Sequence, residues 1–186
     1  MCGIAGYVGD RESADVLVDA LSKLEYRGYD SAGIAVFDHG NIKVKKCKGR
    51  LANLVEKMDE EGKPQGHVGI GHTRWATHGE PSDINSHPHG NKRVTIVHNG
   101  IIENYKKLKD FLVGEGYSFA SETDTEVAAK LLDYYYDGDP MKTIAKVLSE
   151  IKGSYALGIM FRDFPDEIFA VRKDSPLTVS YTHLRA

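Results

Sequence analysis

Long apolar runs are absent from this 186-residue sequence, and its charges nearly balance. No stretch approaches the ~20 apolar residues that a membrane span requires, and Asp10, Arg11 and Glu12 stand where a secretory signal would need its apolar segment. A formal net charge of −3 provides no broad basic field, which argues against binding to nucleic acid or to an anionic membrane. We therefore expect a cytoplasmic globular protein that acts on small polar molecules.

Cysteine is also scarce, with only Cys2 and Cys47. We do not expect them to pair in a reducing compartment, and Cys47, in a strand-like basic segment, is predicted to be structural. Cys2 has two interpretations. It is either a small buried residue of an N-terminal strand or, once Met1 is removed, a nucleophile whose own α-amino group is the base. The second interpretation is chemically sound because an α-amino group titrates at about 7.7–8.0 and a thiol at about 8.5.

Apolar periodicity predicts one α+β domain in which helices cover antiparallel sheet. Strands are expected at 3–9, 32–37, 42–47, 68–72, 93–98, 155–161 and 168–171, and helices at 12–25, 51–58, 101–112, 124–135 and 140–151. Asn99-Gly100 is predicted to be a tight turn between a strand and a helix. Thr123 and Glu126 have the spacing of a capping box, which places Asp124 in the first turn of a helix.

The least regular and chemically densest segment is 67–89, which contains the single tryptophan, Trp75. Long polar loops that carry Trp, Arg and His more often bind ligands than pack a core, so we expect a functional loop. The histidines clustered in and near this segment invite a metal site as an alternative interpretation. Their spacing does not support it, since no His-x-x-x-His pair lies on a helix, and no metal or other cofactor is predicted.

Six short motifs occur in order: MCGIAG at 1–6, RGYDSAG at 27–33, HTRWATHG at 72–79, HPH at 87–89, HNGIIENY at 98–105 and SETDTE at 121–126. Together they resemble the glutaminase domain of the glutamine–fructose-6-phosphate aminotransferases (isomerizing), the glucosamine-6-phosphate synthases. The resemblance covers residues 1–177 and implies the four-layer αββα fold of the N-terminal-nucleophile hydrolases, with two mostly antiparallel sheets between helices. Residues 178–186 do not fit the family pattern and receive no role.

The resemblance implies hydrolysis of L-glutamine to L-glutamate and ammonia. In the full enzymes of the family, a C-terminal sugar isomerase domain uses the ammonia to convert fructose 6-phosphate to glucosamine 6-phosphate. That domain is absent from this sequence and is the expected partner; homodimer formation is left open. Two alternatives remain: a non-catalytic fragment that binds glutamine or a partner, and the glutaminase domain of another class II amidotransferase, such as amidophosphoribosyltransferase or asparagine synthetase.

Five residues are assigned to chemistry on this basis. Cys2 attacks the glutamine amide, and the Asn99 side chain and the Gly100 backbone N–H stabilise the oxyanion. Arg74 offers a planar fork for the α-carboxylate of glutamine, and Asp124 offers an anion for its α-ammonium. Without the motifs each has an ordinary explanation: a simple turn for Asn-Gly, a surface ion pair for Arg74 and a favourable helix-terminal charge for Asp124.

By resemblance, Trp75, Thr77 and His78 belong to a substrate-binding loop, and Trp75 is expected to act in a lid that closes over glutamine. Arg27 and His87 match family positions and are assigned to the scaffold of the site.

Overall fold

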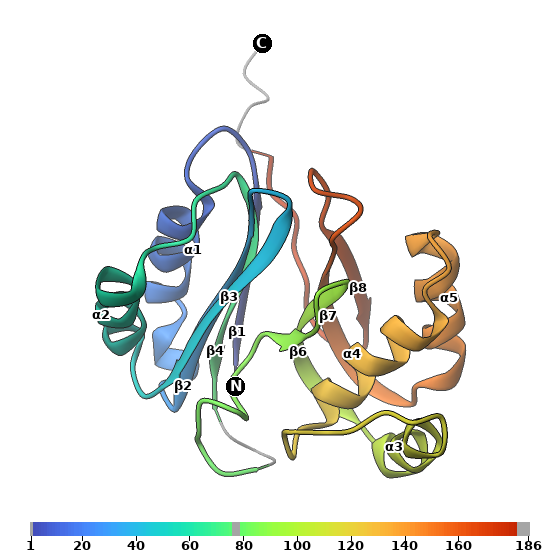
Figure 1. Ribbon diagram of the computed structural model, residues 1–186. Helices are drawn as coiled ribbons and strands as arrows, with labels where there is room; N and C mark the ends of the chain where they lie inside the picture. The colour runs from blue at the N-terminus through green and yellow to red at the C-terminus, as the bar shows by residue number, and fades with distance from the viewer. Residues whose placement is uncertain (1, 76–78, 182–186) are drawn as a thin grey trace.

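Two four-stranded antiparallel sheets lie face to face in the computed structural model, which describes residues 2–75 and 79–181 (Figure 1). The first sheet has the order β1-β4-β2-β3 and consists of β1 (Gly3–Val8), β2 (Ser31–Asp38), β3 (Asn41–Lys48) and β4 (Val68–Arg74). The second has the order β5-β6-β7-β8 and consists of β5 (His89–Gly90), β6 (Val94–Ile102), β7 (Gly153–Phe161) and β8 (Phe169–Lys173).

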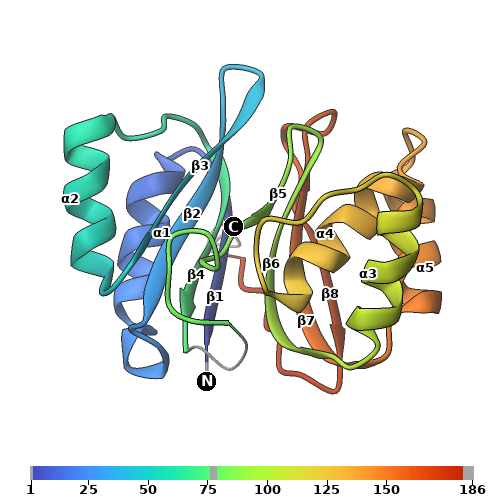
Figure 2. The ribbon, with the colours of Figure 1, turned by 60° about the horizontal axis from the view of Figure 1, so that its bottom comes forward.

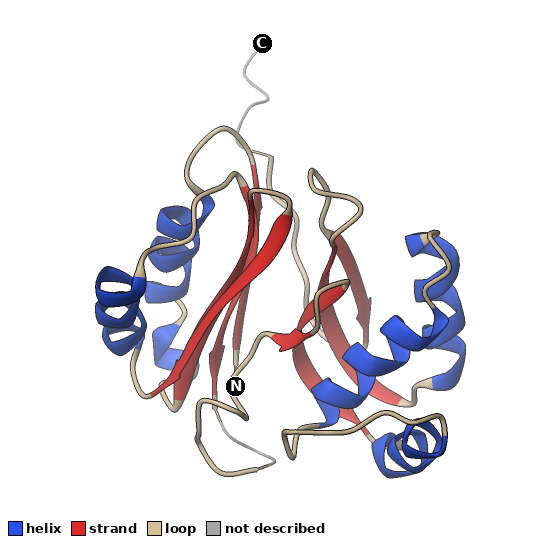
Figure 3. Ribbon diagram, viewed as in Figure 1, coloured by secondary structure: helices blue, strands red, loops and turns tan. Residues whose placement is uncertain are grey.

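Helices cover the outer face of each sheet, which gives the four layers that the sequence predicts (Figures 2 and 3). The first sheet is covered by α1 (Ser13–Ser22) and α2 (Leu51–Glu61), and the second by α3 (Tyr105–Gly114), α4 (Asp124–Tyr135) and α5 (Pro140–Glu150). Fully buried leucines such as Leu17 of α1 and Leu54 of α2 pack these two helices against the first sheet. Burial of each leucine side chain stabilises the fold by about 1.5–3 kcal/mol. The αββα prediction is therefore confirmed.

The side chains between the two sheets change from apolar to polar along the length of the strands. Successive residues of a strand point to opposite faces, so Ile70 and His72 of β4 share the face that looks toward the second sheet. At one position Ile70 and Val97 of β6 belong to a small apolar cluster. Two residues further along both strands, His72 and Asn99 hydrogen-bond to each other. The interlayer is thus apolar at one end and polar at the other.

The predicted tight turn at Asn99-Gly100 is wrong. Strand β6 continues through both residues to Ile102, with Asn99 opposite Ala156 and Gly100 opposite Tyr155 of β7. Pairing with this long neighbouring strand overrides the local preference of the dipeptide. Gly100 has a φ of 121°, and a Cβ there would lie 2.0 Å from the Ser154 carbonyl oxygen, so close backbone approach explains the glycine.

Other differences are small. Helix α1 ends at Ser22 instead of reaching residue 25, and a 3₁₀ turn follows at Glu25–Arg27. The two-residue strand β5 was not predicted. The predicted cap of α4 is present, because Thr123 Oγ1 accepts from the Glu126 N–H at 3.2 Å. No helix in the described part of the chain is long and apolar enough to cross a membrane.

Candidate active site

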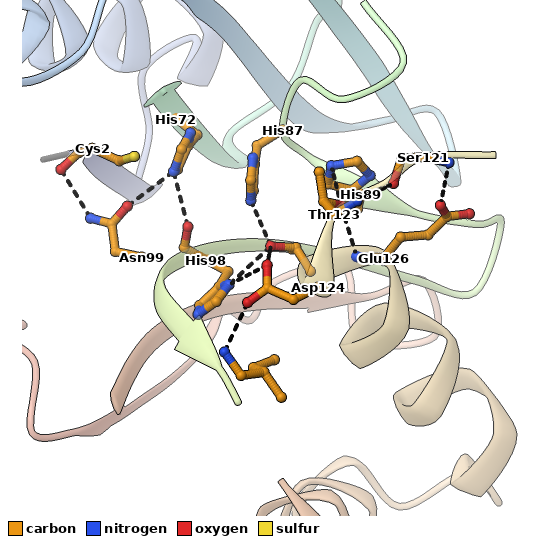
Figure 4. Close-up of polar contacts among 12 residues, drawn as sticks. Cys2, His72, His87, His89, His98, Asn99, Ser121, Thr123, Asp124 and Glu126 are labelled. Atoms are coloured by element: carbon orange, nitrogen blue, oxygen red, sulfur yellow. Dashed lines mark hydrogen bonds and ion pairs between the residues drawn. The ribbon is translucent and has the colours of Figure 1, made fainter. Parts of the chain in front are cut away.

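The polar end of the interlayer contains a small cavity to which both sheets and α4 contribute. Figure 4 shows polar contacts among the residues in and around it. Cys2 directly precedes β1, Arg74 is the last residue of β4, and Gly100 lies on β6. Asp124 lies in the first turn of α4. The cavity is lined by Cys2, Arg74, His87, His98, Gly100, Thr123, Asp124 and Thr125. Segments about a hundred residues apart in the sequence therefore meet at one place.

Cys2 is half-buried, and both its sulfur and its backbone carbonyl oxygen accept hydrogen bonds. Its sulfur accepts a hydrogen bond from the Trp75 backbone N–H at 3.2 Å and lies 3.5 Å from the Trp75 carbonyl oxygen. Its own carbonyl oxygen accepts from Asn99 Nδ2 at 3.1 Å. Burial raises the pKa of the thiol, although the Trp75 N–H and the charge of Arg74 act in the opposite direction. A nearby base is therefore needed to generate thiolate at neutral pH.

The side chains of Arg74 and Asp124 are buried at the same cavity. Arg74 is 4% exposed, which does not fit a surface ion pair, and its Nη2 donates to the Gly79 carbonyl oxygen at 3.3 Å. Burial lowers the pKa of its guanidinium, and the charges of Cys2, Asp30 and Asp124 oppose this shift. Asp124 Oδ2 accepts from the Ile102 N–H at 2.8 Å, so the carboxylate is fixed by the strand that also carries Gly100. A cation and an anion thus line one cavity.

A network of histidines lies at and beside the cavity, and of its members the sequence had assigned only His87 to the site. His72 and His87 stack with ring centroids 4.1 Å apart, and His87 Nε2 lies 2.9 Å from Thr125 Oγ1. The same hydroxyl lies 2.9 Å from His98 Nδ1, which is itself 3.9 Å from Asp124 Oδ1. The only available signal was the clustering of histidines on and between strands. Within the described residues, no group of three His, Cys, Asp or Glu could hold a metal ion.

The remaining predicted residues are placed as follows. Trp75 is 44% exposed, and its ring meets Tyr29 edge to face at 5.4 Å. His87 lines the cavity and is buried. Arg27 instead lies over the Tyr26 ring, whose hydroxyl its Nε contacts at 3.0 Å, and it is not among the residues lining the cavity. Thr77 and His78 lie outside the described residues.

Acid is expected to destabilise the fold through these histidines. Burial lowers the pKa of His72 to about 3, that of His98 below its ordinary value, and those of His87 and His89 far below it. As the pH falls below about 6.5, the unfolded chain binds protons that the native state excludes. Each histidine then lowers the free energy of unfolding by up to about 1.4 kcal/mol per pH unit, and all four together by up to about 5.6 kcal/mol per pH unit.

Urea unfolding between pH 7.5 and 5 measures this effect. A His89→Gln variant is expected to reduce the slope of unfolding free energy against pH by about one quarter. His67→Gln, at an exposed position, is the matched control, because it leaves all four buried histidines and their contribution to the slope in place. Equal stability of the parent protein at pH 7.5 and 5 would contradict the neutral-histidine interpretation.

Comparison with known proteins agrees with this geometry. The family model described as a glutamine amidotransferase domain matches residues 72–183, more than half of the chain. The chain belongs to the glutamine amidotransferase family. This amidotransferase domain is 59% identical over 181 residues to glutamine–fructose-6-phosphate aminotransferase (isomerizing) from Clostridium tetani, and 48% identical to the protein of that name from Acinetobacter baylyi. The matches cover 96% of this chain but only 30% and 29% of those relatives.

Solved structures show the same architecture. Glutamine phosphoribosylpyrophosphate amidotransferase from B. subtilis superposes with a TM-score of 0.75 at 29% identity, over 87% of this chain and 35% of that one. A glutamine aminotransferase class-II domain protein from Silicibacter pomeroyi has a TM-score of 0.61 at 16% identity, over 83% of this chain and 76% of that one. The second likeness concerns the fold alone. The predicted family and layered fold are thus confirmed.

Proposed function

We propose that this domain hydrolyses glutamine to glutamate and ammonia, with Cys2 as the nucleophile after removal of Met1. The observation that carries the proposal is the convergence on one cavity of a thiol, a buried guanidinium and a buried carboxylate. A free amino acid presents the complementary set: an electrophilic amide, an α-carboxylate and an α-ammonium. A binding fragment without catalysis would not require the thiol.

The reaction begins when the α-amino group of Cys2 takes the thiol proton, directly or through one water. The thiolate adds to the amide carbon of glutamine, and the resulting oxyanion receives hydrogen bonds from Asn99 Nδ2 and the Gly100 N–H. Collapse of this intermediate breaks the C–N bond; the protonated α-amine supplies the proton to the departing ammonia. Water, deprotonated by the same amine, then attacks the γ-glutamyl thioester, releasing glutamate and regenerating the thiol.

Selection of free glutamine follows from the charges at the cavity. Arg74 binds the α-carboxylate through two parallel N–H donors, and Asp124 binds the α-ammonium. A peptide-bound glutamine lacks one or both of these charges and would leave a buried charge without its partner. Trp75, Thr77 and His78 complete the substrate loop in this proposal, and Trp75 belongs to the lid. His87 supports the site, and Arg27 is proposed as a more distant scaffold residue.

The chain spans about 30% of the length of the curated relatives it matches. The name of these relatives supports a proposal for the whole protein: the ammonia is used elsewhere in the polypeptide to convert fructose 6-phosphate to glucosamine 6-phosphate. The partner of this domain is then a sugar isomerase domain, and L-glutamine is its substrate.

An assay of ammonia release tests the function. The Met1-free protein is expected to hydrolyse glutamine but not N-acetylglutamine, which lacks the α-ammonium. Arg74→Lys should raise the KM for glutamine about 10- to 100-fold, since a charge-assisted hydrogen bond of ~1.5–3 kcal/mol is lost. Arg162→Lys, at an arginine that contacts Asp163 on the surface, is the matched control and should leave KM unchanged. Glutamine binding without any ammonia release would favour a non-catalytic fragment.

A further inference from the structure

The side-chain amide of Asn99 can act in the oxyanion site only in one of its two orientations. Its nitrogen must face the cavity, because an amide oxygen there would repel the oxyanion. Nδ2 donates to the Cys2 carbonyl oxygen at 3.1 Å, and this nitrogen carries a second N–H. Oδ1 faces the opposite way and lies 3.0 Å from His72 Nε2. The orientation of the amide therefore depends on what His72 offers at that nitrogen.

Two oxygen atoms determine the tautomer of His72. Its Nε2 lies 3.0 Å from Asn99 Oδ1 and 3.0 Å from the His98 carbonyl oxygen, which can only accept (Figure 4). Nε2 must therefore carry the proton. Among the described residues, Nδ1 has no hydrogen-bond partner, so a proton there would be a buried donor without an acceptor. The network leaves one consistent assignment: Nε2–H donating, Nδ1 unprotonated.

The imidazole is also fixed in position and charge. His72 is 1% exposed and stacks on His87, and it lies on β4 between the paired strands β1 and β2. Burial lowers its pKa to about 3, so it stays neutral at the pH of catalysis. It presents a constant donor to Asn99 and takes no part in proton transfer.

We propose that His72 is a positioning residue that locks the Asn99 amide with its nitrogen toward the oxyanion. The inference rests on the proposed function, since it assigns how one donor of that site is oriented. His72 touches two residues of the lining, His87 and His98, but is not itself among the residues that line the cavity. In this proposal it acts on the oxyanion through Asn99. Its hydrogen bond links the first sheet to the catalytic strand of the second.

A matched pair of substitutions isolates the donor. Glutamine places its amide nitrogen where histidine has Nε2, whereas methionine has a similar shape without a donor. His72→Met is expected to lower kcat about 10- to 100-fold, below the ~10²–10³-fold typical of deleting an oxyanion donor, with little change in KM. His72→Gln should restore most of that loss. Equal kcat in the two variants would overturn the proposal, as would a loss confined to KM.

A double-mutant cycle distinguishes positioning from a general structural effect. In an Asn99→Ala background, His72→Met should lower kcat by less than about 2-fold, because there is no amide left to orient. The same loss in both backgrounds would overturn the inference. Thermal unfolding of each variant separates lost stability from lost orientation.

A direct measurement on the unmodified protein keeps the proposal falsifiable if His72→Met does not fold. The ¹⁵N chemical shifts of the His72 ring at pH 7 are expected to show a protonated Nε2 and an unprotonated Nδ1. The opposite tautomer would overturn the inference even if glutamine hydrolysis is confirmed. Conversely, an unmodified protein that shows this tautomer but releases no ammonia would refute the proposed function. The assignment that His72 fixes the orientation of the Asn99 amide would not be contradicted.

Discussion

Cys2→Ala protein is expected to release no ammonia from glutamine while folding normally. Removal of a catalytic nucleophile lowers kcat by at least about 10⁴-fold, because the remaining donors have no covalent intermediate to stabilise. The side chain is only half-buried at the start of β1, so its loss leaves little cavity. A coupled assay for ammonia and an intact mass after an electrophilic glutamine analogue measure the two consequences, lost turnover and lost adduct.

Cys47→Ala is the matched control, since it removes the second of the two cysteines. Cys47 is 7% exposed and belongs to the core beneath α2. Its replacement should cost about 1 kcal/mol of stability and leave both turnover and the adduct intact. Ammonia release that survives Cys2→Ala, or an adduct that moves to Cys47, would refute the assignment of the nucleophile.

Gly100→Ala is expected to have the second largest effect. An added Cβ would meet the Ser154 carbonyl oxygen at 2.0 Å, so β6 must move away from β7. The left-handed φ of 121° adds about 1–3 kcal/mol of backbone strain. Because Asn99 precedes the displaced residue, misplacement of both oxyanion donors should lower kcat by about 10²-fold or more. Urea unfolding and steady-state kinetics measure stability and rate separately.

Gly138→Ala separates the two causes. Gly138 also has a positive φ, 102°, but a Cβ there meets nothing within 4 Å. This control should show the backbone strain alone, with a modest loss of stability and unchanged kcat. If Gly100→Ala lowered stability and kcat no more than Gly138→Ala, the close approach of β7 to Gly100 would not matter for activity.

Much of the fold was predictable because its signals are local. The strands predicted at 32–37 and 42–47 form the neighbours β2 and β3, and the Thr123 cap fixes the start of α4 as its spacing predicted. The Asn99-Gly100 prediction failed because its structure is decided by β7, more than fifty residues away. Local propensity cannot show that a turn-forming dipeptide has a long strand to pair with.

The site was predictable to a different extent. Motifs pointed to Cys2, Arg74 and Asp124, which do line one cavity. Nothing in the residues around His72 or Thr125 indicated that His72 contacts Asn99 or that Thr125 joins His87 to His98, since these partners are far away in the sequence. Arg27 shows the converse: a motif position that the fold places beside Tyr26, away from the cavity lining.

The division of the site between two sheets has a mechanical consequence. Cys2 directly precedes β1 of the first sheet and Asn99 lies on β6 of the second, and residues along a strand are ~3.3 Å apart. In the proposed mechanism, a slip between the layers smaller than this repeat would separate the Cys2 sulfur from the Asn99 amide while the hydrogen bonds within each sheet and helix stayed intact. Each sheet with its helices could therefore be fully folded while the domain has no activity. The rate of glutamine hydrolysis would then report how well the two layers are aligned.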